Sequence, residues 1–108
     1  MCVYKIEEIA ERVRPVAEQY KLSKVYLFGS YARGEATEES DVDLLVGAEN
    51  VHGFAFGGLY NDLQEALGKE LDLITLRGLY SEYRTDWLSV RLRNAIERDR
   101  RLIYDEQG

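Results

Sequence analysis

The chain has 108 residues, of which 45% are hydrophobic and 31% are charged, and its formal net charge is −6. This length suits a single domain, residues 1–108, with one core, and no apolar run approaches the roughly 20 residues that a membrane helix needs. The acidic balance lacks the basic footprint of proteins that hold long nucleic acids, so we expect no stable binding to DNA or RNA polymers. Binding of a nucleotide carried with a metal ion is still compatible with this charge.

The first half of the chain predicts one helix and two strands. Apolar residues recur at helical spacing over residues 4–20, and Pro15 should kink this helix or restart it. The run KVYLF (24–28) is rich in β-branched and aromatic residues and predicts a strand that ends at Gly29. We expect SYARG to form one helical turn and EATEES a solvated loop, followed by a second strand at DVDLLVG (41–47).

The second half predicts two helices and two strands. A Gly-rich connection (48–58) should lead to a helix over 59–68, closed by Gly68. ELDLITL (70–76) predicts a third strand, central in the sheet, and RLIYD (101–105) a last strand at a sheet edge. Between them a helix should run from Tyr80 to about Arg98, with Tyr80, Tyr83 and Trp87 packed in the core.

The alternation of helices and strands indicates an α/β layered domain. A full helix between the second and third strands favours a parallel crossover there. The shorter joint between the first two strands leaves their orientation open, so we expect a small mixed sheet flanked by helices.

Three aspartates mark a candidate metal site. Asp41 and Asp43 are two residues apart in a strand, so both point to the same face. Neighbouring carboxylates repel, and a divalent cation between them reverses that repulsion. If the third strand lies beside the second, Asp72 can complete the cluster, with Glu70 as the alternative. Oxygen ligands without a Cys/His cluster favour Mg²⁺ or Mn²⁺ over zinc.

Gly29 and Ser30 form a candidate phosphate cradle. A glycine that leaves a strand lets a ligand approach the backbone, and the start of a helical turn presents free N–H groups. Arg33, on the same turn, can add a fixed positive charge. The alternative for Arg33 is a surface ion pair with Glu35 or Glu38. A phosphate cradle beside a carboxylate pair is suited to nucleotidyl transfer with two metal ions.

The stretch GSYARGEATEESDVDLL matches the G-S-x10-D-x-D signature of the DNA polymerase β-like nucleotidyltransferases. Together with LYNDLQEALGKELDLIT and the short chain, it resembles the minimal nucleotidyltransferases, commonly the antitoxin halves of HEPN/MNT toxin–antitoxin pairs. The resemblance implies a polymerase β-type core that transfers AMP from ATP to a tyrosine of a HEPN toxin and so silences it.

The resemblance also implies residue roles. Gly29 and Ser30 would hold the triphosphate and Arg33 would help to neutralise it. Asp41 and Asp43 would bind two Mg²⁺ ions, and Asp72 would bind one of them near the attacking hydroxyl.

No acceptor-binding domain is visible in the sequence, so we expect the acceptor to bring its own site or a second copy of this chain to supply part of it. Two alternatives remain: a small-molecule nucleotidyltransferase of the aminoglycoside-modifying kind, and an antitoxin that acts by binding alone. The single cysteine cannot form an internal disulfide, which favours a cytoplasmic protein.

Overall fold

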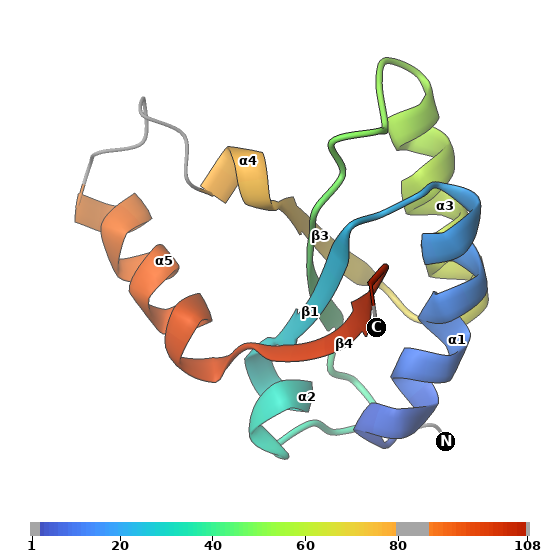
Figure 1. The fold of residues 1–108 in the computed structure, drawn as a ribbon. Coiled ribbons are helices and arrows are strands. Elements are labelled where there is room, and N and C mark those ends of the chain that lie inside the picture. Colours follow the sequence, from blue (N-terminus) through green and yellow to red (C-terminus); the bar gives the residue numbers. More distant parts are fainter. Residues whose placement is uncertain (1–2, 80–86, 108) are drawn as a thin grey trace.

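The computed structural model describes residues 3–79 and 87–107. Its centre is a four-stranded sheet in the order β3-β2-β1-β4 (Figure 1). β1 (Lys24–Phe28) pairs antiparallel with β2 (Val42–Val46) and with β4 (Arg101–Asp105), whereas β2 pairs parallel with β3 (Leu71–Thr75). The prediction of a mixed sheet with a parallel crossover is confirmed, as is the place of β4 at an edge.

Helices pack on both faces of this sheet. α1 (Ile6–Gln19) and α3 (Ala55–Leu67) lie side by side over one face, where they enclose the main core (Figure 1). α5 (Trp87–Asp99) buries Ile96 against the other face, beside Phe28 and Leu45. Strand residues alternate between these two layers because successive side chains point to opposite faces. No helix within the described ranges is both long and apolar enough to cross a bilayer.

α1 is a single helix that continues through Pro15, so the prediction of a restart there is wrong. Pro15 is exposed, while Val13, Val16 and Ala17 on either side of it are buried in the main core. The apolar face of the helix is therefore unbroken, and its burial outweighs the one backbone hydrogen bond that proline cannot make.

α3 begins at Ala55, four residues earlier than predicted, so part of the supposed Gly-rich connection is helical. Gly58 lies in this first part, where a β-carbon would come within 2.8 Å of the Tyr20 hydroxyl. That hydroxyl donates a 2.7 Å hydrogen bond to Asp62 one turn further along α3. The close contact between Tyr20 and α3 thus explains why glycine occupies position 58 inside a helix, although the sequence alone suggested a connection there.

β3 lies at an edge of the sheet, not at its centre, which corrects the prediction for the third strand. It ends at Thr75, and Leu76–Leu79 form the short helix α4, which the sequence pattern did not indicate. The predicted packing of Tyr80, Tyr83 and Trp87 concerns side chains outside those that the structure describes.

Candidate active site

The candidate site begins where β1 ends. Gly29 follows Phe28 and has φ +73°, in the left-handed region that suits glycine. It opens the short helix α2 (Gly29–Arg33), which Gly34 ends in a left-handed conformation, so the predicted helical turn is confirmed. Ser30 is half-buried on this turn, and its carbonyl accepts a 2.9 Å hydrogen bond from the Glu35 N–H.

Gly29 lies directly against the carboxyl group of Asp43. Phe28 and Asp43 are register partners in the β1–β2 pair, so the residue after Phe28 passes over the Asp43 side chain. A β-carbon on Gly29 would lie 3.0 Å from Asp43 Cγ and would overlap Oδ2. The absence of a side chain at position 29 therefore allows the backbone turn and the carboxylate to lie in contact, an arrangement that the sequence did not indicate.

Asp43 and Asp72 form a carboxyl pair across the parallel β2–β3 ladder, where they are register partners. Burial, a hydrogen bond with Asp72 and the charges of Asp72 and Asp41 raise the pKa of Asp43 to about 7, against the opposing effect of Arg33. Asp43 is half-buried, whereas Asp72 is exposed because β3 is an edge strand. The expectation that Asp72 is buried in a central strand is therefore wrong, but its place beside Asp43 is as predicted.

Asp41 stands just before β2 and is exposed. Its charge acts on Asp43. Within residues 3–79 and 87–107, no group of three or more His, Cys, Asp or Glu side chains is arranged closely enough to hold a metal ion. The structure thus brings together Asp43 and Asp72, whereas Asp41 lies outside this pair, exposed just before the start of β2. Glu70 precedes β3 and accepts a hydrogen bond from Gln64 instead.

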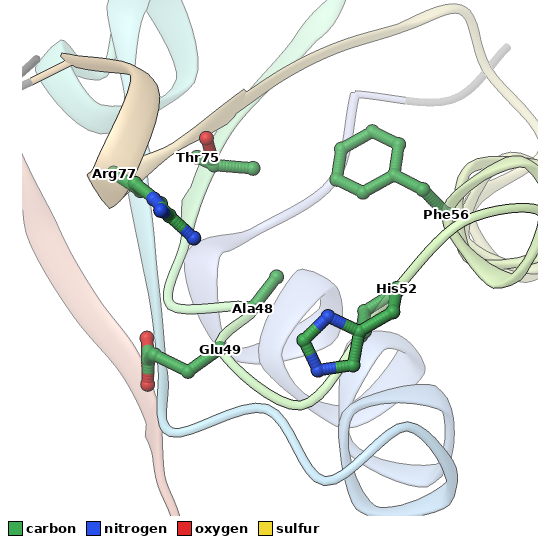
Figure 2. Close-up of a pocket in the computed structure, with 7 residues that line it drawn as sticks. Ala48, Glu49, His52, Phe56, Thr75 and Arg77 are labelled. Atoms are coloured by element: carbon green, nitrogen blue, oxygen red, sulfur yellow. The ribbon is translucent and has the colours of Figure 1, made fainter.

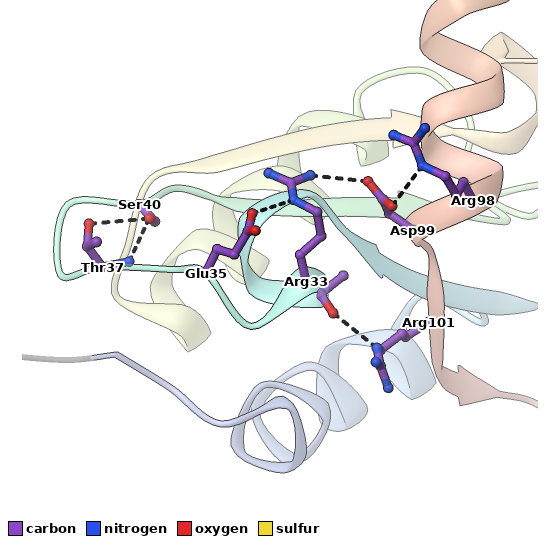
Figure 3. A network of polar contacts seen from close by, with 8 residues as sticks. Arg33, Glu35, Thr37, Ser40, Arg98, Asp99 and Arg101 are labelled. Carbon is purple, nitrogen blue, oxygen red and sulfur yellow. Dashed lines mark hydrogen bonds and ion pairs between the residues drawn. The ribbon is translucent and has the colours of Figure 1, made fainter.

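Arg33 bridges two carboxylates at the end of α2 (Figure 3). Its Nε donates to Glu35 Oε1 at 2.8 Å and its Nη1 to Asp99 Oδ2 at 3.1 Å. These hydrogen bonds raise the pKa of Arg33 further, so it stays charged. The Glu35 partner was anticipated as the alternative for Arg33. Asp99 was not anticipated, because it is 66 residues away along the chain and only the fold brings it near.

A cavity of about 220 Å³ lies elsewhere, at the opposite end of β2 and β3 (Figure 2). Thr75 and Arg77 line one side of it, and His52 and Phe56 line the other. None of the residues that line this cavity is an aspartate of the carboxyl pair or a residue of the Gly29 turn. The candidate active site lies instead at the end of the sheet where β1 meets α2.

Residues 6–103 match the family model described as Nucleotidyltransferase domain. A relative from Methanocaldococcus jannaschii, named provisionally as a protein adenylyltransferase, is 36% identical, with 93% of this chain and 94% of the relative covered. The protein adenylyltransferase MntA of Thermococcus cleftensis is 35% identical, with 75% of this chain and 87% of that protein covered.

Solved structures share this fold. A structure named provisionally as a minimal nucleotidyltransferase superposes with a TM-score of 0.68 at 30% identity and covers 94% of this chain and 98% of that one. A chain of a toxin–antitoxin crystal structure with AMP-PNP superposes with a TM-score of 0.66 at 26% identity, covering 91% of this chain and 74% of that one. The fold, the matched residues and these relatives lead to one conclusion. The chain belongs to the nucleotidyltransferase domain family, in its minimal nucleotidyltransferase group, and is an enzyme of that class.

Proposed function

We propose that this nucleotidyltransferase transfers AMP from ATP to a hydroxyl group of a partner protein and thereby acts as an antitoxin. The observation that carries the proposal is the contact of the Gly29 turn with Asp43, itself paired with Asp72. One surface thus offers a backbone turn for phosphate and a carboxyl pair for proton and cation chemistry. A protein that only covered its partner would have no use for this arrangement.

The triphosphate would bind on the α2 turn. The first N–H groups of a helical turn have no partner within the turn, and they attract phosphate oxygens. Gly29 lets the phosphates approach the backbone, the Ser30 hydroxyl can donate a hydrogen bond, and the Arg33 guanidinium supplies positive charge. These three residues lie within five consecutive positions, so they would act on one group of phosphate oxygens.

Asp41, Asp43 and Asp72 would hold divalent cations, with Mg²⁺ as the expected ion and Mn²⁺ as a substitute. The chemistry of the donors fits, because carboxylate oxygens are hard ligands and because a cation would replace the proton that Asp43 retains beside Asp72. Asp41, which the structure does not place close enough to complete a three-carboxylate group, would join the pair when a cation binds. When bound, such ions stabilise negative charge on the attacking and leaving oxygens of the phosphoryl group.

The chemical step is an in-line displacement at the α-phosphorus of ATP. The acceptor hydroxyl oxygen forms a bond to this phosphorus, the bond to the bridging oxygen breaks, and pyrophosphate leaves. Asp72 would orient the acceptor hydroxyl and receive its proton. Its exposure on the edge strand favours this role, because a macromolecular hydroxyl can reach an exposed carboxylate more easily than the half-buried Asp43.

The acceptor we propose is a tyrosine of a HEPN-type toxin that shares the cytoplasm with this chain. The support is the family resemblance of the signature, the adenylyltransferase names of the relatives and the toxin–antitoxin complex among the similar structures. The exposure of Asp72 on the edge strand β3 is consistent with a macromolecular acceptor, because a large partner can reach a carboxylate there.

Intact mass spectrometry of the partner tests this function. The product of a neighbouring gene, if it encodes a small all-helical protein, is co-expressed with wild-type chain, with Asp43→Asn or with Glu39→Gln. Glu39 is exposed in the loop before β2 and controls for loss of one negative charge.

The proposal expects the mass of one or more AMP groups on the partner with wild type and Glu39→Gln, and none with Asp43→Asn. A partner that stays unmodified yet is silenced by all three chains would make this a binding-only antitoxin. Adenylylation of an added aminoglycoside by the purified chain, with no change in the partner, would select the small-molecule alternative.

A further inference from the structure

Asp99 lies at the end of α5, next to the phosphate turn and outside every motif that the sequence analysis identified. Its Oδ2 accepts the hydrogen bond from Arg33 Nη1 at 3.1 Å, and its Oδ1 accepts one from Arg98 Nε at 3.3 Å (Figure 3). Its side chain is only 13% exposed, compared with 66% for Glu35, the other acid on Arg33. Asp99 is therefore the more enclosed of the two anchors.

The position of Asp99 is fixed by the packing of α5. Ile96, one turn earlier, is 2% exposed and packs against Phe28 and Leu45. Phe28 is the last residue of β1, directly before Gly29, and Leu45 is two residues after Asp43 on the same strand. The buried face of α5 thus rests on the strands that carry the site, which sets the Asp99 carboxylate at a fixed place beside α2.

The hydrogen bonds to Glu35 and Asp99 use two of the three guanidinium nitrogens of Arg33. Nε is used by Glu35 and Nη1 by Asp99, and the described residues supply no partner for Nη2. Arginine normally has considerable rotamer freedom, and a guanidinium fixed on two of its nitrogens can present the third to a ligand without ordering it first. Arg33 is close enough to the site for its charge to act on Asp43.

We propose that Asp99 is a positioning residue for nucleotide binding, which holds the Arg33 guanidinium so that Nη2, for which the described residues supply no partner, can bind the triphosphate on the Gly29 turn. The proposal rests on the proposed function only in taking the α2 turn as the phosphate site. Asp99 touches neither nucleotide nor acceptor and acts through Arg33. Glu35 is exposed, and an exposed ion pair contributes little, so it should matter much less.

Calorimetric binding of AMP-PNP with Mg²⁺ to the purified full chain tests this role without any acceptor. Asp99→Asn keeps the shape of the side chain and removes its charge, and we expect the Kd to rise about 5- to 10-fold. The matched control Glu35→Gln should change the Kd by less than about 2-fold. Arg33→Ala should weaken binding at least as much as Asp99→Asn.

The double variant Arg33→Ala/Asp99→Asn distinguishes two roles for Asp99: positioning of the Arg33 guanidinium, or stabilisation of α5 packing alone. If Asp99 acts through Arg33, the double variant binds AMP-PNP as weakly as Arg33→Ala alone. A full additional loss from Asp99→Asn in the Arg33→Ala background would overturn the proposal, and so would an unchanged Kd in Asp99→Asn.

A second measurement needs no Asp99 variant, so it can still overturn the proposal if Asp99→Asn does not fold. The Arg33 Nε–H resonance, assigned with Arg33→Ala, should shift when AMP-PNP and Mg²⁺ are added, and an unmoved resonance would contradict the proposal. The proposed function and the positioning role of Asp99 can be refuted independently. Binding with this pattern but no AMP transfer refutes the proposed function alone, whereas AMP transfer with a Kd indifferent to Asp99 refutes the positioning role alone. Absence of any AMP-PNP binding by wild type overturns both.

Discussion

Gly29→Ala tests the contact on which the candidate site depends. Alanine at φ +73° carries a backbone strain of about 1–2 kcal/mol. The new methyl group would also overlap Asp43 Oδ2, so the carboxyl group must move away from the turn, which disturbs its pairing with Asp72. We expect a total loss of about 2–4 kcal/mol in the free energy of unfolding. A shift of about 1 Å in a reacting group can cost on the order of 100-fold in rate.

Gly34→Ala is the matched control for this variant. Gly34 has nearly the same φ, +74°, and ends the same short helix, but a β-carbon there would have no atom within 4 Å. It should lose about 1–2 kcal/mol and keep its activity. Thermal unfolding and the rate of AMP transfer are measured for both variants at a temperature where each is folded. Equal rates for Gly29→Ala and Gly34→Ala would refute the argument that the Gly29–Asp43 contact sets the geometry of the site.

Three further predictions concern charge and backbone. In metal-free protein the raised pKa of Asp43 means that the folded state keeps a proton that the unfolded state releases, so stability falls as pH rises from about 4 toward 7. Asp43→Asn should remove this slope in urea titrations, and identical slopes for the two proteins would contradict the assignment. Asp72→Asn should reduce AMP transfer at least about 100-fold while leaving the melting temperature unchanged or higher, because it removes an exposed charge that repels Asp43. Pro15→Ala should raise the free energy of unfolding by about 1–3 kcal/mol by restoring a helical hydrogen bond, and a lower melting temperature would show that proline is needed there.

The presence of the strands could be predicted from local sequence. The order of the strands in the sheet could be predicted only in part. Val25 and Leu27 alternate with Tyr26 and Phe28, and this alternation matches the two layers that the strands separate. The place of β3 at an edge depends on what lies beyond it, and no local pattern records that. The error about the burial of Asp72 follows directly, because an edge strand leaves a side chain exposed that a central strand would cover.

The site was predictable where its residues belong to one stretch and not where the fold brings a distant residue close. Gly29 directly follows β1 and Asp43 lies in β2. Their place in one signature predicted that the phosphate turn and the carboxylate pair serve one site, but the orientation of the two strands was left open, and the Gly29–Asp43 contact was not predicted. Asp99 is the last residue of α5 and lies in an arginine-rich run, a pattern typical of a solvated helix face. Its role depends on the packing of Ile96 against β1 and β2, a contact that the sequence pattern alone could not specify.

The order of elements along the chain has a consequence for how the protein folds. β1, α2 and β2 are consecutive, so closing the loop from Phe28 to Val42 brings Gly29 and Asp43 together at a small entropic cost. β3 joins only after α3 has formed a crossover, and β4 pairs with β1 only when nearly the whole chain is available. We therefore expect the turn and the first carboxylate to be organised early, during synthesis or refolding. The Arg33–Asp99 contact should close last, so that an incompletely made chain has the phosphate turn but cannot yet hold its arginine in place.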